Sequence, residues 1–223
     1  MLAATTRFVP RSANVSLARR WVTTLPNNPH IKVFDNPASP ASHVLTYLER
    51  NPPSASLAIG TCTQMPPTPA SFRENARFMD ILRQVVEEYG HEDEDVIAQA
   101  KGYAGSGGSH LGSAGWASSP PQRPSRGSAR NQAGGGGRGG WVHLSDRRNP
   151  PDFGRIAWPE DILGSVEVDQ NGRVIGRVQP SGTYRVVTNE GILGLSPFLR
   201  EKLVERLKLE EARACAGGEQ PST

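Results

Sequence analysis

A glycine-rich run divides the chain and limits what can fold. Thirteen of the 24 glycines fall within 102–140, and this segment contains no Asp or Glu. Its four basic residues are Arg123, Arg126, Arg130 and Arg138. A segment so poor in apolar side chains buries too little surface to offset the entropy of an ordered backbone. The sequence therefore predicts a disordered linker at 102–140, with folded segments at 22–101 and 141–211.

The first 21 residues have the composition of an organelle targeting signal. They are rich in Arg, Ser, Thr and Ala, lack acidic residues, and contain only short apolar runs, which disfavours a secretory signal. Residues 13–22 have the amphipathic pattern of a helix that binds a membrane surface. Arg19, Arg20 and Trp21 resemble a site for the mitochondrial processing peptidase. We expect a presequence at 1–21 and a mitochondrial matrix protein; plastid import and a basic disordered tail are the alternatives.

The net positive charge of the chain, +3, is due to the four arginines of this presequence. The whole chain has 25 basic and 22 acidic residues, and removing the four arginines up to Trp21 leaves 21 basic residues. Global charge therefore gives little support to nucleic-acid binding. The run Gly134 to Gly140 contains a single RGG-like element at Arg138, so contact with RNA through the linker is a weaker alternative.

The sequence predicts no metal or cofactor and no membrane-spanning segment. Cys62 and Cys215 have no metal-binding or redox spacing and are expected to be free thiols. The five histidines are scattered, and no pair has the spacing of a zinc site. No stretch approaches the roughly 20 apolar residues of a transmembrane helix.

Local patterns in 22–101 predict strands and helices in alternation. We expect strands at 30–34 and 56–62, joined by a helix capped by Ser42 that ends before Asn51, as in a βαβ unit. Ser71 and Glu74 have capping-box spacing, and the following apolar repeat predicts a helix that ends at Gly90. A shorter helix is expected to begin at Asp93 or Asp95.

The segment 141–211 is predicted to form a small antiparallel meander and a closing helix. Strands are expected at 141–145 and 183–188, a resumed strand at 155–158, one helical turn at 159–164, and a hairpin around Asn171-Gly172. Ser196-Pro197 opens an amphipathic helix, followed by a disordered tail at 212–223. The expected fold class is α+β, with a small mixed or antiparallel sheet. Because each half is small, we expect both to share one core.

Three blocks stand out in this sequence: WVHLSDRRNPP at 141–151, RIAWPEDILGSVEV at 155–168 and SGTYRVVT at 181–188. These blocks resemble segments of uncharacterised, mostly fungal proteins. The likeness extends to 30–34 and 56–61, and so covers most of the chain outside the glycine-rich run. The resemblance implies a coherent fold and a fungal source, and it implies no activity.

A charged and aromatic cluster follows the linker and is the candidate site. Its residues are His143, Asp146, Arg147, Arg148, Arg155 and Trp158. Arginine forks can hold a carboxylate or phosphate, and Trp and Arg are enriched at binding surfaces. The alternative is an internally paired loop that orders the proline-rich turn. His143, Ser145 and Asp146 do not form a catalytic triad, because adjacent residues of a strand point to opposite sides.

The sequence favours an accessory or protein-interaction function over catalysis, because no complete catalytic constellation is present. We expect protein partners in mitochondria. An enzyme or small-molecule binder with a site around His143, Arg147 and Arg148 is the first alternative. A protein associated with mitochondrial RNA or ribosomes through the linker arginines is the second.

Overall fold

The computed structural model describes residues 23–104, 140–152 and 155–217. These residues form three α-helices and ten strands, and every strand pair is antiparallel. The predicted α+β class is therefore confirmed. The presequence, its cleavage site at Arg19, Arg20 and Trp21, and nearly all of the glycine-rich run lie outside the described residues.

The first half folds into a five-stranded antiparallel meander. Its strands are β1 (Thr23–Leu25), β2 (Asn28–Asp35), β3 (His43–Thr46), β4 (Gly60–Cys62) and β5 (Phe72–Glu74), in this spatial order. The inner face contributes Val33 and Leu45, which are directly paired, to the main core. On the other face Phe34, Val44 and Ala58 form a small separate cluster.

The predicted helix from Ser42, and the βαβ unit built on it, are wrong. Residues 43–46 form β3, which pairs with β2 and β4 in antiparallel register. Both faces of β3 are buried, so its apolar residues do not alternate with polar ones. The spacing of Val44, Leu45 and Leu48 therefore resembles the apolar spacing of an amphipathic helix. The strand expected at 56–62 is also shorter, and only Gly60–Cys62 joins the sheet.

Helix α1 (Ala76–Tyr89) is the predicted central helix, although its start differs from the prediction. The capping residue is Asn75, whose side chain accepts a hydrogen bond from the amide of Arg77 at 3.1 Å. The side-chain Nδ2 of Asn75 also donates to the carbonyl oxygens of Ala55, Ser56 and Ala58. Ser71 is not the cap, because the residues after it complete β5. Gly90 follows the helix, as expected, and begins a 3₁₀ turn, η1 (Gly90–Glu92).

The second half contains a three-stranded sheet. Its strands are β6 (Gly140–Ser145), β7 (Ile162–Val168) and β8 (Val174–Pro180), in the order β6-β7-β8. The predicted hairpin at Asn171-Gly172 is confirmed, and Gly172 has a φ of 71°, which favours glycine. Ser165 pairs with Gln179 and Glu167 pairs with Ile175, so residues 176–178 bulge opposite Val166 alone.

The remaining elements are short except for the last helix. A 3₁₀ turn, η2 (Pro159–Asp161), is the predicted helical turn, but it leads directly into β7 and does not end at Gly164. No strand forms at 155–158. Of the strand expected at 183–188, only β9 (Val187–Thr188) is formed, and it pairs with β10 (Gly191–Ile192). Helix α4 (Pro197–Gly217) begins as predicted and continues beyond Ala212, where the sequence indicated a tail.

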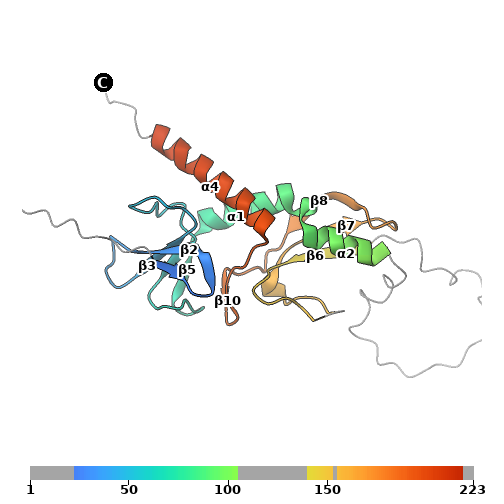
Figure 1. The fold of residues 1–223 in the computed structure, drawn as a ribbon, viewed down its shortest axis with the longest axis horizontal. Coiled ribbons are helices and arrows are strands. Elements are labelled where there is room, and N and C mark those ends of the chain that lie inside the picture. Colours follow the sequence, from blue (N-terminus) through green and yellow to red (C-terminus); the bar gives the residue numbers. More distant parts are fainter. Residues whose placement is uncertain (1–22, 105–139, 153–154, 218–223) are drawn as a thin grey trace, which may run out of the picture.

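One apolar cluster contains side chains from both halves of the chain. Helix α1 contacts β7, β8 and α4, while α2 (Glu94–Ala104) contacts β6. Figure 1 shows α1 between the five-stranded sheet, at the left, and the three-stranded sheet, at the right. Helix α2 continues through Gly102 to Ala104, and Gly140 already belongs to β6, so ordered structure extends slightly into the predicted linker from each side.

Candidate functional site

Arg147 and Arg148 are adjacent in sequence but belong to different environments. The guanidinium of Arg147 lies at the surface and pairs with two acidic residues at the start of α2. Its Nε donates to Asp95 Oδ2 at 2.7 Å, and its Nη2 donates to Glu94 Oε1 at 2.7 Å. These contacts join the candidate loop to α2, and the two carboxylates raise the pKa of Arg147.

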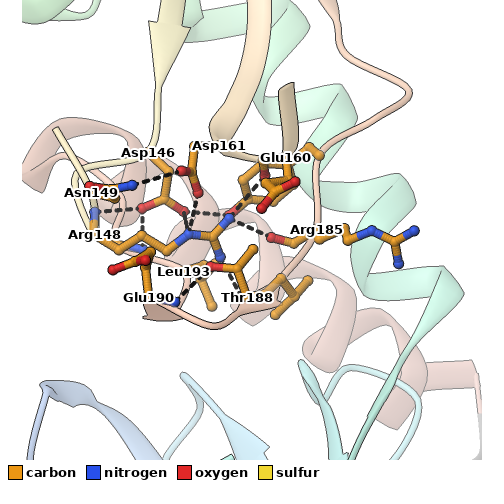
Figure 2. Close-up of polar contacts among 12 residues, drawn as sticks. Asp146, Arg148, Asn149, Glu160, Asp161, Arg185, Thr188, Glu190 and Leu193 are labelled. Carbon is orange, nitrogen blue, oxygen red and sulfur yellow. Dashed lines mark hydrogen bonds and ion pairs between the residues drawn. The ribbon is translucent and has the colours of Figure 1, made fainter. Parts of the chain in front are cut away.

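Arg148 is almost completely buried, with a side-chain exposure of 4%. Its Nε donates to Asp161 Oδ1 at 2.7 Å. The two terminal nitrogens donate to three backbone carbonyls, those of Glu160, Arg185 and Val186, at 2.8 to 2.9 Å. Figure 2 shows the guanidinium enclosed by these groups. Most of its donors are therefore used within the protein and do not face a ligand.

Asp146 is fully buried beside this guanidinium, and its carboxylate binds the backbone of the same loop. Its Oδ1 accepts hydrogen bonds from the backbone amides of Arg148 and Gly194, each at 2.8 Å. Its Oδ2 accepts from the hydroxyl of Tyr184 at 2.7 Å. Burial raises the pKa of Asp146, while Arg148 and these hydrogen bonds oppose the rise.

This buried polar cluster of Asp146, Arg148, Asp161 and Tyr184 joins three segments that are far apart in sequence. The loop after β6 supplies Asp146 and Arg148, η2 supplies Asp161, and the chain before β9 supplies Tyr184 and two carbonyls. The ring of Tyr184 also lies against the guanidinium, 5.4 Å from its carbon to the ring centre. The geometry is that of the internally paired loop, which was the alternative to a ligand site.

His143 lies on the outer face of β6, away from this cluster. Its Nδ1 is 2.8 Å from the hydroxyl of Ser165, directly across the sheet on β7. Partial burial lowers the pKa of His143, which favours the neutral imidazole near neutral pH. Alternation along the expected strand at 141–145 places Trp141, His143 and Ser145 on one face, and the burial of Val142 and Leu144 on the other face agrees with this.

Arg155 and Trp158 project from the loop into solvent. The side chain of Arg155 is 78% exposed and lies 4.0 Å from Asp152, its nearest carboxylate partner. Trp158 is 68% exposed. The six predicted site residues therefore do not converge, and only Asp146 and Arg148 belong to one cluster.

The outer face of the three-stranded sheet carries two exposed apolar side chains, Trp141 and Ile175, on either side of Glu167. Trp141, Glu167 and Ile175 are paired across the three strands. Trp141 is 50% exposed and Ile175 is 48% exposed. Beside them lies the second row, His143, Ser165 and Gln179. The opposite face of the sheet contributes to the core, and the exposed face that carries these two rows is named the outer sheet face.

Within the described ranges, no group of three His, Cys, Asp or Glu side chains could hold a metal ion. Cys62 is buried and Cys215 is exposed, and both are free thiols as predicted. No helix in the described part of the chain is long and apolar enough to cross a bilayer.

No family model, curated protein or solved structure matches the chain. The resemblance to fungal proteins therefore stays a prediction.

Proposed function

We propose that the protein is a mitochondrial accessory protein that binds a protein partner through the outer sheet face. The observation that supports this most directly is the row of Trp141, Glu167 and Ile175 on a sheet whose other face is buried. Tryptophan is the residue type most enriched at binding hot spots, and large exposed apolar side chains on one flat face favour association.

The alternative of an enzyme or small-molecule site around His143, Arg147 and Arg148 receives less support. Arg148 is buried among its own partners, Arg147 is paired with α2, and His143 faces a different side of the sheet. A catalytic centre requires such groups to converge on one position in space. The RNA alternative depends on arginines outside the described residues and remains a prediction from sequence.

The test is affinity purification of the tagged protein from isolated mitochondria. The double variant Trp141→Ser with Ile175→Ser is expected to lose a stoichiometric partner that the wild type retains, because it removes the apolar contacts of the outer sheet face. Leu209→Ser is the matched control, since Leu209 on α4 is 55% exposed and lies outside this face.

Mass spectrometry of the purified protein tests the location in the same experiment. Cleavage by the processing peptidase is expected to leave a terminus near Val22. Equal recovery of the partner by the double variant and the wild type would contradict the proposed surface, while an intact Met1 would contradict the presequence.

A further inference from the structure

Glu167 lies at the centre of the outer sheet face and carries a charge that the described residues do not balance. It is exposed on β7, and it is paired with Trp141 of β6 on one side and with Ile175 of β8 on the other. In the described part of the chain its carboxylate has no ion-pair partner. An anion thus stands between two exposed apolar side chains.

The basic residues around this face lie beside other groups. At the β7-β8 turn, a hydrogen bond from the amide of Arg173 lowers the pKa of Asp169, and the guanidinium of Arg173 lowers it further. Arg177 shares a surface hollow with acidic residues of α1. Burial lowers the pKa of His143, which favours the neutral ring near neutral pH. The centre of the outer sheet face is therefore negative at Glu167.

This charge selects among the possible occupants of the face. A second copy bound across a two-fold axis brings the same patch of both molecules together. Two Glu167 carboxylates would then approach and repel each other. A nucleic acid would bring phosphate groups to the same carboxylate. A cationic group of a protein partner is the complement that the face lacks.

Arginine is the cation that fits Glu167 and Trp141 together. Paired residues of an antiparallel sheet have Cβ atoms about 4.5–5.5 Å apart, so one guanidinium can contact both side chains. A guanidinium forms two parallel hydrogen bonds with a carboxylate and stacks on an indole ring. Ile175, on the other side of Glu167, offers contact area for an apolar side chain. In an extended segment every second side chain points to the same side, so these two partner residues would be separated by one residue.

We propose that the outer sheet face binds an extended segment of a partner protein in which one residue separates an arginine from an apolar residue. The guanidinium pairs with Glu167 and lies against Trp141, while the apolar side chain packs on Ile175. This inference rests on the proposed function, because it names the chemistry of the partner at the same surface. Exposed ion pairs contribute more to specificity than to affinity, so the preference for a charged segment is the quantity to measure.

The test is an NMR titration of the uniformly ¹⁵N-labelled full chain with the acetylated and amidated pentapeptide Ser-Arg-Thr-Leu-Ser. Saturable shifts are expected at the backbone amides of 141–143, 165–168 and 174–176 and at the indole Nε1 of Trp141. A matched peptide contains citrulline, which has the shape of arginine without its charge. This peptide is expected to bind about fivefold more weakly, because the ion pair and the stacking of a cation are lost.

Four variants examine the residues of the face. Glu167→Gln is expected to bind both peptides equally, and Glu167→Arg is expected to prefer a peptide with glutamate in place of arginine. Trp141→Ser and Ile175→Ser are each expected to weaken both peptides. Glu190→Gln is the matched control, since Glu190 is exposed between β9 and β10 and lies outside this face. It is expected to distinguish the peptides as the wild type does.

Failure of this inference is distinguishable from failure of the proposed function. If the citrulline peptide binds as tightly as the arginine peptide while Trp141→Ser weakens both, the choice of a cation is overturned and the surface is retained. Absence of saturable shifts on this face also overturns the inference, whereas affinity purification of the Trp141→Ser and Ile175→Ser double variant decides the proposed function separately. Shifts of the same amides that depend on protein concentration without peptide would assign the face to a second copy.

Discussion

At the scale of single residues, Arg148 is the buried cation of the polar cluster. A guanidinium with 4% exposure holds two carboxylates, Asp146 and Asp161, that are themselves buried. Removing such charges from water costs free energy, and only close pairing and complete hydrogen bonding offset that cost. The conformation of the loop after β6 thus depends on the side chain of Arg148. A substitution of Arg148 therefore tests whether the cluster stabilises the fold.

Arg148→Met is expected to lower the free energy of unfolding by about 3–5 kcal/mol, because it leaves two buried carboxylates without their cation. Urea unfolding followed by circular dichroism measures the change. Arg155→Met is the control and is expected to have almost no effect, since Arg155 is highly exposed. If Arg148→Met does not fold, Asp161→Asn offers a milder change. Wild-type stability in both variants would contradict a structural role for the cluster.

The sequence identified Asp146 and Arg148 as members of a charged cluster, but it did not distinguish Arg148 from Arg147. Their neighbours in sequence are nearly the same. The difference arises because the carbonyls of Arg185 and Val186, which are distant in sequence, come to lie beside Arg148. The sequence placed Asp161 in the expected helical turn at 159–164 and Tyr184 in the expected strand at 183–188, and it did not pair either residue with Arg148. The local pattern of residue types contains no signal for contacts between residues that are so far apart in sequence.

At the scale of elements, the starts of two helices are joined through one buried pair. Asp93 precedes α2 and accepts a hydrogen bond from the amide of Asp95 at 2.9 Å. Ser196 precedes α4, accepts from the amide of Leu199 at 3.1 Å, and donates to Asp93 Oδ2 at 2.5 Å. Each side chain therefore caps its own helix and bonds to the other cap. The two helix starts should respond together to a change in either.

A double-mutant cycle tests this shared cap. Ser196→Ala and Asp93→Ala are each expected to cost about 1–2 kcal/mol, because each removes an N-cap. The double variant is expected to cost less than the sum of the single variants by about 1 kcal/mol, since the bond between the caps is lost only once. Ser39→Ala, at an exposed residue, is the control. Strict additivity in urea unfolding would show that the caps act independently.

Elements with strong local signals were predicted from the sequence, whereas elements set by distant partners were not. Helix α1 has a long apolar repeat, the β7-β8 hairpin has Asn171-Gly172, and α4 has Ser196-Pro197 at its start. Strand β3 was missed because burial on both faces removes its alternation. The segment 183–186 was expected to be a strand, but its backbone carbonyls at Arg185 and Val186 bind Arg148 instead.

At the scale of the whole molecule, the two halves are joined by polar contacts as well as by the apolar cluster. Glu74 on β5 accepts a hydrogen bond from the amide of Val186 at 2.9 Å. Asn28 on β2 donates to the carbonyl of Leu193 at 2.9 Å. Arg147 pairs with the start of α2. Each half thus completes hydrogen bonds that the other half leaves open, and neither half buries its apolar side chains alone.

Cutting the chain should therefore not separate the halves. A protease site inserted within 105–139 is expected, after cleavage, to leave two fragments that co-elute in gel filtration and unfold in one transition. Expressed alone, a fragment ending at Ala104 is expected to lack a cooperative transition, because its core is incomplete. Two separate fragments that each unfold cooperatively would show that the halves are independent domains.

The bulge in β8 has a consequence for how the protein behaves at high concentration. An exposed outer strand with a regular ladder can pair with the strand of another molecule and start aggregation. β8 is an outer strand of its sheet, and Gly176, with a φ of 76°, breaks its regular pairing pattern. The bulge thus discourages polymerisation by strand addition at the β8 edge, while Trp141 and Ile175 remain exposed on the outer sheet face.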